Sequence, residues 1–234
     1  MERFLRTEAI LGKEAMKKLF SAKVIVFGIG GVGGHTADAL ARSGVGEIHI
    51  VDPDLVSVTN INRQLIANEN TVGMKKTEVM KRHLESINPE IKVKCFDIFY
   101  TPENAEEIDL SGYDYIVDAI DTVPSKVNIA ERANKLSIPL ISSMGFGNKL
   151  DPTKVEVKDL SKTEVCPLAR TMRRLLRLKG INHLKTVYSK EIPIAPDTPI
   201  EDGGKRTVGS VAFVPSVAGL VIASEVVKDI AIKE

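Results

Sequence analysis

The sequence predicts an α/β fold, with a Rossmann-like, mostly parallel sheet covered by helices on both faces and a C-terminal α/β elaboration. Residues 23–54 provide the first observation, because they follow the order strand, glycine turn, helix, strand and acid of a nucleotide-binding βαβ unit. Strand and helix patterns then alternate up to Ser143, which indicates a parallel sheet. We expect a core in residues 1–150 and the elaboration in residues 151–234, within one globular unit.

The βαβ unit begins with Lys23–Phe27, whose β-branched and aromatic residues predict a buried strand. Apolar residues at helical spacing follow the glycine turn as far as Gly44, and alternation over Glu47–Val51 predicts a second strand that ends at Asp52. A backbone without side chains can approach phosphates, and the free N–H groups of a helix N-terminus favour anions. An acid at the tip of the second strand can accept hydrogen bonds from ribose hydroxyls. The glycines expected to face a nucleotide are Gly28, Gly30, Gly31 and Gly33.

Two segments flank this unit. Residues 1–20 are expected to form one or two amphipathic helices. The stretch Pro53–Gly73 is rich in asparagine and keeps neither period for long, so we expect a loop with one short helix. A loop of about 20 residues inside a compact α/β domain is uncommon and usually functional. Its candidate contact residues, with the lysine that follows it, are Asp54, Asn60, Asn62, Arg63, Gln64 and Lys76.

The remaining elements follow in order. After a helix that ends at Asn88–Pro89, the core is expected to contain strands at 93–98, 113–120 and 139–143, a short acidic helix at 102–108 and a helix at 123–136. In the elaboration we expect strands at 154–159 and 184–188, helices at 167–179 and 217–232, and a mobile loop at 190–205. Ligands bind beyond the carboxyl ends of parallel strands, so the glycine turn, Asp52, Asp121 and Met144 are expected to meet in one crevice.

Composition indicates a soluble globular protein, with 27% charged residues and a net charge of +1. This balance argues against bulk electrostatic coating of nucleic acid but leaves room for a local basic patch. Cys95 and Cys166 cannot build a disulfide framework, and no signal peptide precedes the first strand, so we expect a cytoplasmic protein. The uncharged run Val208–Ile222 contains Pro215 and is shorter than the ~20 residues of a membrane span, so we expect no span.

Four motifs carry a family resemblance. They are GIGGVGG at 28–34, VDPDLVSVTNINRQ at 51–64, VGMKK at 72–76 and DAIDT at 118–122. With them the chain resembles the ubiquitin-activating-like adenylating superfamily, which includes activators of sulfur-carrier proteins. The resemblance implies ATP and Mg²⁺ as cofactors and a homodimer.

The superfamily's roles transfer to positions of this sequence. The glycine turn would face the nucleotide phosphates and Asp52 the ribose, while Arg63 and Lys76 would contact phosphates and Asp121 would bind Mg²⁺. Arg6 would be donated to the ATP of the neighbouring subunit. Asp54 is a candidate second neighbour of the metal, and Asp118 is interpreted as structural. The resemblance implies that Asn60 contacts phosphate. For Asn62 and Gln64 both alternatives stay open, contact with phosphate or ordering of the loop.

Within the superfamily the chain is most similar to the tRNA threonylcarbamoyladenosine dehydratases, through DLSKT at 159–163, PLAR at 167–170, VYSKE at 187–191 and GSVAFVP at 209–215. This similarity implies ATP-dependent cyclisation of threonylcarbamoyladenosine in tRNA through an acyl adenylate. The alternative is activation of a ubiquitin-like or sulfur-carrier protein, although the usual Cys-x-x-Cys zinc pairs are missing from the sequence. Whether a sulfur-transfer protein is a further partner is left open.

Two more distant alternatives use the same βαβ unit. An NAD-dependent dehydrogenase would give Arg63 and Lys76 no obvious role, and no His or Tyr is placed for hydride transfer. A non-catalytic nucleotide- or RNA-binding scaffold would not need the charged set around the phosphates.

Two features of the elaboration are candidates for function. The helix at 167–179 places arginines at i, i+3, i+4 and i+7, and arginine favours phosphate recognition, so we expect contact with the tRNA backbone. These residues are Arg170, Arg173, Arg174 and Arg177. Cys166, just before the helix, is interpreted as an inert apolar residue, with a nucleophilic role as the alternative.

Overall fold

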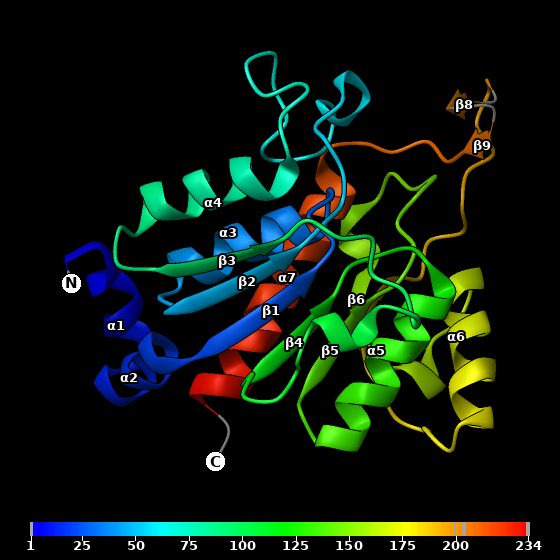
Figure 1. Ribbon diagram of the computed structural model, residues 1–234. Helices are drawn as coiled ribbons and strands as arrows, with labels where there is room; N and C mark the ends of the chain where they lie inside the picture. Colours follow the sequence, from blue (N-terminus) through cyan, green and yellow to red (C-terminus); the bar gives the residue numbers. More distant parts are fainter. Residues whose placement is uncertain (1, 199, 203–204, 233–234) are drawn as a thin grey trace.

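The computed structural model describes residues 2–198, 200–202 and 205–232 (Figure 1). Its main sheet has seven strands in the order β3-β2-β1-β4-β5-β7-β6. β6 runs antiparallel to β7, and the other neighbouring strands are parallel. The strands are β1 (Lys23–Phe27), β2 (Glu47–Val51), β3 (Lys92–Phe96), β4 (Tyr115–Asp118), β5 (Leu140–Ser143), β6 (Val155–Asp159) and β7 (Lys185–Ser189).

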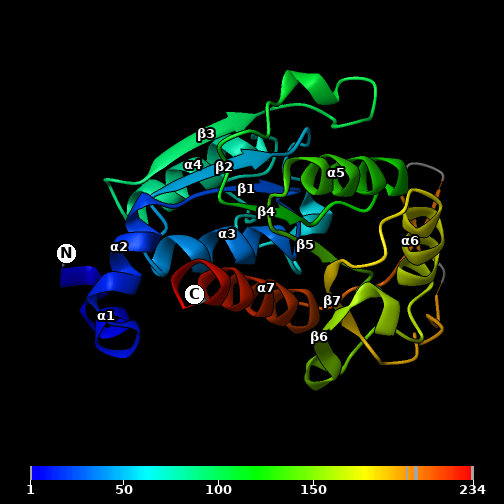
Figure 2. The same cartoon turned by 90° about the horizontal axis from the view of Figure 1, so that it is seen from below.

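Helices cover both faces of this sheet (Figure 2). α3, α4 and α7 pack on one face, where α3 and α7 lie against each other, and α5 covers the opposite face with α6 beside it. The predicted α/β fold is therefore confirmed. The α-helices are α1 (Leu5–Leu11), α2 (Lys13–Ser21), α3 (Gly33–Arg42), α4 (Lys76–Ile87), α5 (Val123–Leu136), α6 (Pro167–Leu178) and α7 (Phe213–Ala231).

The strand order creates the position of the site. From β1 the chain builds outward through β2 and β3, and then returns to place β4 and β5 on the other side of β1. The order therefore reverses between β1 and β4, and in open parallel sheets a crevice forms at the carboxyl ends of the strands at such a point. β1 is buried along nearly its whole length, as its apolar sequence predicts, because it lies in the middle of the sheet.

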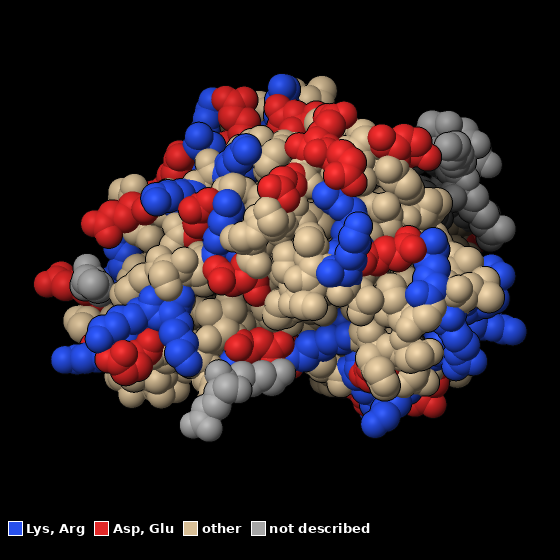
Figure 3. Space-filling model, turned by 60° about the horizontal axis from the view of Figure 1, so that its bottom comes forward, with Lys and Arg blue, Asp and Glu red and all other residues tan. Residues whose placement is uncertain are grey.

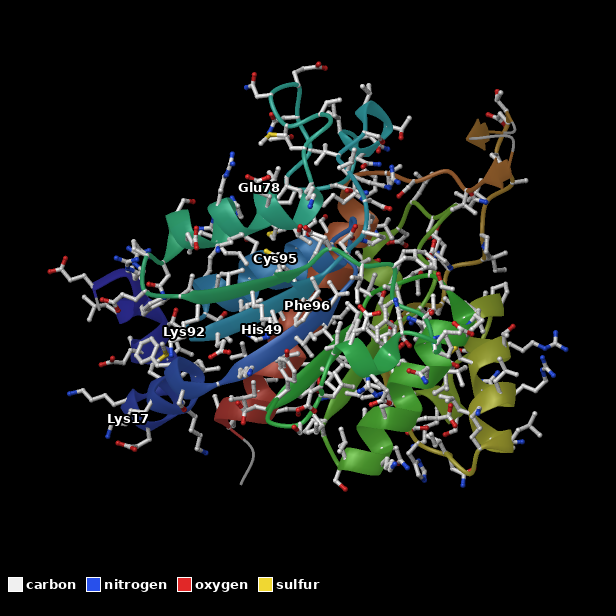
Figure 4. The ribbon with its side chains drawn as sticks, viewed as in Figure 1. Lys17, His49, Glu78, Lys92, Cys95 and Phe96 are labelled. Carbon is white, nitrogen blue, oxygen red and sulfur yellow. The ribbon has the colours of Figure 1, made fainter. Side chains whose placement is uncertain are left out.

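Two apolar clusters hold the helices to the sheet. The first joins β1 and β2 to α3, α4 and α7, and Gly219 lets α7 come so close to α3 that an added Cβ would stand 2.5 Å from the Val32 carbonyl oxygen. The second lies under α5 and the segment that follows β3. His49 on β2 and Phe96 on β3 belong to this side, with ring centroids 6.1 Å apart, whereas Cys95 points toward α4 (Figure 4). Alternation along β3 thus serves both layers.

The acidic helix expected at 102–108 is wrong. That segment contains a 3₁₀ turn at Ala105–Glu107, and the buried Ala105 and Ile108 pack under α5. Arg132 on α5 donates hydrogen bonds to the carbonyl oxygens of Ala105 (2.6 Å) and Ile108 (2.8 Å), so a side chain satisfies groups that a longer helix would have paired internally. Tertiary contacts therefore replace the helix.

The C-terminal part joins the same sheet as the core. β7 lies between β5 and β6, so strands from both sides of residue 150 are neighbours. The segment expected to be a loop at 190–205 contains part of a two-stranded antiparallel pair, β8 (Ile200–Asp202) with β9 (Lys205–Thr207), and residues 199, 203 and 204 lie outside the described residues. Over the described parts of the chain, no helix has the length and apolar character needed to cross a membrane.

Candidate active site

A cavity of about 340 Å³ opens at the carboxyl ends of β1, β2 and β4, where the strand order reverses. Segments far apart in the sequence meet here: the glycine turn, the end of β2, the loop before α4, the segment after β3 and the loop after β4. Its lining includes most of the residues predicted to contact a nucleotide. They are Gly28, Gly30, Gly31, Asp52, Asp54, Asn60, Arg63, Gln64, Lys76 and Asp121.

The glycine turn is shaped by two of its glycines. Gly28 has φ +86°, a left-handed conformation that L side chains rarely adopt. An added Cβ at Gly33 would stand 1.8 Å from the Gly28 carbonyl oxygen, so Gly33 permits α3 to begin directly against the turn. Gly33 is buried and lies behind the cavity lining, whereas Gly30 lines the cavity, where an added Cβ would stand 3.9 Å from Gln64 Nε2. The turn therefore places backbone at the cavity floor, with the N-terminus of α3 directly behind it.

Asp52 is buried at the tip of β2 and accepts hydrogen bonds from the backbone N–H groups of Ile29 (2.7 Å) and Asp54 (3.0 Å). Burial raises the pKa of the Asp52 carboxyl, although the Lys76 ammonium and these N–H donors act in the opposite direction. Lys76 Nζ lies 2.7 Å from Asp54 Oδ2 and 3.8 Å from Asp52 Oδ1. The two acids therefore hold the lysine at the cavity wall, at the first residue of α4.

The loop before α4 is ordered by its own polar groups. Asn60 Oδ1 accepts a hydrogen bond from the Ser57 backbone N–H (3.1 Å), which caps a short 3₁₀ turn. Arg63 Nη1 donates to the Thr59 carbonyl oxygen (2.8 Å) and to Asn62 Oδ1 (2.9 Å). These bonds hold the guanidinium along the loop while it lines the cavity.

Gln64 differs from its neighbours in the loop. The residue is 7% exposed, and its Oε1 has no hydrogen-bond partner among the described residues. Buried side-chain acceptors are nearly always paired, so an orphan at a cavity wall indicates a position that a ligand completes. Asn62 takes a different role, since its Nδ2 donates to the Ser210 carbonyl oxygen (3.0 Å) and ties the loop to the segment before α7.

The loop after β4 carries two acids with opposite environments. Asp118 is fully buried and accepts hydrogen bonds from Lys126 Nζ (2.8 Å) and Ser142 Oγ (2.6 Å). The interpretation of Asp118 as structural is confirmed, because its carboxylate is engaged inside the protein. Asp121 is exposed at the cavity, where it accepts a long hydrogen bond from Thr122 Oγ1 (3.4 Å).

Comparison with known proteins identifies the family of this site. The ThiF family model matches residues 2–233. The tRNA threonylcarbamoyladenosine dehydratase of Bacillus subtilis is 44% identical over 98% of this chain and 95% of its own length. The chain belongs to the ThiF family and, within it, to the tRNA threonylcarbamoyladenosine dehydratases. The Escherichia coli dehydratase is 39% identical over 84% of this chain and 76% of its own length. A crystal structure of that dehydratase, TcdA, in complex with ATP superposes with a TM-score of 0.89 at 36% identity, covering 98% of this chain and 93% of that one.

Arg6, which the family resemblance assigns to the ATP of a neighbouring subunit, lies away from the cavity. It is exposed on α1, at the end of the sheet where β1 begins, while the cavity lies at the opposite end of β1 (Figure 1). Within one chain the structure therefore does not bring Arg6 together with Arg63, Lys76 and Asp121.

The four arginines of α6 have different environments. Arg170, Arg174 and Arg177 are exposed, and we call these three residues the exposed-arginine face. Arg173 Nη1 donates to the carbonyl oxygens of Leu160 (3.0 Å) and Thr163 (2.7 Å). This guanidinium therefore anchors α6 to the turn before it. Figure 3 shows Lys and Arg side chains gathered at the right-hand edge of the molecule, where α6 lies.

Two further residues lie outside the cavity lining. Met144 was expected in the crevice, but it is 4% exposed and packs in the apolar cluster between α5 and α6, so the expectation is wrong. Cys166 is likewise 4% exposed in that cluster. Its burial agrees with the interpretation as an inert apolar residue.

The sequence analysis did not identify three residues that line the cavity, nor the buried Lys126 beneath it. Ile98, Phe99 and Thr122 line the cavity, and Phe99 is 57% exposed beside it. The available signal was an aromatic residue directly after the strand expected at 93–98. Lys126 gave no signal, because a lysine inside a helix normally indicates a solvated face.

Proposed function

We propose that this chain uses ATP to dehydrate threonylcarbamoyladenosine in tRNA, closing a ring on the modified adenosine through an acyl-adenylate intermediate. The observation that supports it most strongly is the likeness to a dehydratase over nearly the whole of both chains. The cavity adds a chemical reason, because it gathers two cations, an exposed acid and the N-terminus of α3 at one place. Phosphoryl and nucleotidyl transfer rely mostly on such positioning and charge stabilisation.

The residues present fit ATP. Gly30 brings backbone without a side chain to the cavity wall, and the N–H groups at the start of α3 can donate to phosphates. The buried Gln64 Oε1 has no hydrogen-bond partner among the described residues and can accept a hydrogen bond from the nucleotide. Asp52, at the tip of β2, can accept hydrogen bonds from the ribose hydroxyls once it is ionised. Phosphate oxygens can replace the carboxylate that now faces Lys76, since Asp54 is largely exposed.

The chain's own residues then carry the first step. The threonine carboxylate of the substrate attacks the α-phosphorus of ATP, the bond from that phosphorus to the leaving oxygen breaks, and pyrophosphate departs. Lys76 and Arg63, both at the cavity wall, are placed to stabilise the negative charge that develops on the phosphates. Asn60 would hold the loop that carries Arg63, because its carboxamide caps the turn just before it.

Ring closure follows on the acyl carbon. A carbamoyl oxygen or nitrogen attacks this carbon, and AMP leaves with one of the carboxylate oxygens, so the nucleoside loses one water overall. No nucleophile from the protein is required, which agrees with the buried position of Cys166.

Mg²⁺ fits the donor set at the cavity. Described residues contain no group of three or more His, Cys, Asp or Glu side chains that could hold a metal by themselves. Mg²⁺ does not need one, because it commonly binds through one or two carboxylates, substrate phosphates and waters. Asp121 would supply the carboxylate, and Asp54 would be the second acid near the ion. The ion would neutralise negative charge on the phosphates.

A homodimer and a tRNA surface complete the proposal. Arg6 lies too far from the cavity of its own chain, so it would serve the ATP of a second copy, and the exposed-arginine face would contact tRNA phosphates. α6 begins next to the loop after β5, where Leu168 approaches Gly145.

The experiment that tests the first step is release of pyrophosphate from ATP in the presence of tRNA that carries threonylcarbamoyladenosine. Wild-type protein is expected to release pyrophosphate only when this tRNA is present, and Lys76→Ala or Asp121→Ala is expected to abolish the release. Unchanged turnover in either variant would contradict the assignment. Release that responds to a carrier protein and not to tRNA would select the alternative, activation of a ubiquitin-like or sulfur-carrier protein.

A further inference from the structure

Lys126 on α5 is a lysine in an unusual environment. Its side chain is 0% exposed and lies 2.8 Å from Asp118 Oδ2, whose own side chain is 1% exposed. The ammonium also donates hydrogen bonds to the carbonyl oxygens of Ile120 (3.1 Å) and Ser143 (2.8 Å). Three acceptors therefore surround one buried cation, which matches the three N–H donors of a lysine.

These acceptors come from β4, whose end borders the cavity, from the loop after β4, and from the neighbouring strand β5. Asp118 ends β4, Ile120 is in the loop after it, and Ser143 ends β5. The loop is also held on its other side, because the Ala119 N–H donates to the Phe27 carbonyl oxygen (2.8 Å) at the end of β1. Lys126 thus fixes the path of the chain from the end of β4 to the residue before Asp121.

We propose that Lys126 is a positioning residue for the proposed reaction: by holding the Ile120 carbonyl, it sets the direction in which Asp121 presents its carboxylate to Mg²⁺ and the phosphates. The inference rests on the proposed role of Asp121. The exposed Asp121 is held by a long bond to Thr122, so its position depends on the backbone beneath it. Groups that orient a metal-binding carboxylate affect metal affinity without touching the metal.

The rival explanation is that Lys126 only neutralises the buried Asp118. The two explanations differ for a double variant in which both charges are removed. Asp118→Asn with Lys126→Met leaves no unpaired buried charge, so stability lost in Lys126→Met alone is expected to return in large part. The carbonyl oxygen of Ile120 nevertheless still lacks its donor, so a positioning defect persists while a defect of charge balance disappears.

The test measures binding of α,β-methylene-ATP, which cannot undergo cleavage at the reacting bond, with Mg²⁺ and with chelator. In Lys126→Met and in the double variant, the gain in affinity that Mg²⁺ produces is expected to shrink about 10-fold or more. Affinity in chelator is expected to stay at the wild-type level, because the glycine turn and Asp52 are unchanged. Thermal unfolding of the same samples reports stability separately.

The matched control is Lys149→Met. Lys149 is also buried, at 4% exposure, and its ammonium donates to the carbonyl oxygens of Ser189 and Glu191, away from the loop that carries Asp121. This variant is expected to lose stability and to keep the wild-type response to Mg²⁺.

The outcomes separate the two proposals. A folded double variant with the full wild-type gain from Mg²⁺ would overturn the role of Lys126, and so would an equal loss in Lys149→Met. If Lys126→Met does not fold, the double variant decides alone. Wild-type protein that gains affinity with Mg²⁺ but forms no AMP with the modified tRNA would contradict the proposed function and leave the test of Lys126 valid. A wild type without any gain from Mg²⁺ would overturn the role of Lys126.

Discussion

The position of Arg6 leads to a quantitative prediction. Arg6 lies at the end of the sheet where β1 begins, and the cavity lies where β1 ends. The five residues of β1 span about 16 Å at a rise of roughly 3.3 Å per residue, and an arginine side chain is shorter than this. Arg6 therefore cannot act in the cavity of its own chain, and any role in the reaction requires a second subunit.

Arg6→Ala is expected to lower kcat/KM about 10²–10³-fold, as removal of one charge-stabilising donor does. Lys76→Met, which changes the cavity itself, is expected to be inactive as well. In a mixed dimer of the two variants, the cavity of the Arg6→Ala chain is intact and receives Arg6 from the Lys76→Met chain. Random exchange of subunits in a twofold dimer should therefore restore roughly a quarter of the sites.

The assay mixes the two purified variants, allows subunits to exchange, and follows AMP formation with tRNA that carries threonylcarbamoyladenosine. The control mixes Lys76→Met with Asp121→Ala, two cavity variants that cannot repair each other. Activity in the first mixture and none in the second is the expected result. A first mixture no more active than its components would contradict the role of Arg6 in the cavity of a second subunit.

Other predictions concern the ribose contact, the tRNA surface and the buried cysteine. Burial raises the pKa of the Asp52 carboxyl, and its ionised form is the acceptor, so ATP affinity should fall as pH drops through that raised pKa. Asp52→Asn should remove this acidic limb in calorimetric titrations, and a retained limb would exclude Asp52 as its origin. Changing the exposed-arginine face to Glu should weaken tRNA binding and reduce its salt dependence, with ATP affinity unchanged, whereas Lys17→Glu on α2 should do neither. Cys166→Ser should keep full activity, and a folded but inactive variant would revive the nucleophilic role.

The βαβ unit was predicted most closely. Lys23–Phe27 and Glu47–Val51 have the bounds expected from sequence, and so does the helix at Val123–Leu136. These elements are central in the sheet or packed on it, and their apolar periods are set by burial alone. Local pattern and tertiary environment therefore agree there.

The errors occur where tertiary contacts override a local pattern. The segment at 102–108 has a proline and acids typical of a helix start, but its apolar residues are needed under α5 and Arg132 binds its carbonyl oxygens. The place of β7 between β5 and β6 also lies beyond sequence reasoning, since neither strand's pattern specifies its neighbour.

The candidate site shows the same division. The cavity gathers residues that the motifs singled out, because the carboxyl ends of parallel strands lie at the same edge of the sheet. What each side chain contacts was not predictable: four arginines at helical spacing looked equivalent, yet Arg173 binds the Leu160 and Thr163 carbonyl oxygens. Lys126 and Asp118 are eight positions apart on different elements, and their pairing follows from the fold of the loop between them.

The proposed reaction closes a ring on threonylcarbamoyladenosine at the expense of ATP. The most direct test incubates the purified protein with ATP, Mg²⁺ and tRNA that carries this nucleoside, and then determines AMP and the mass of the nucleoside. We expect AMP that depends on the modified tRNA and a nucleoside lighter by one water. Binding of ATP with an unchanged nucleoside mass would contradict it.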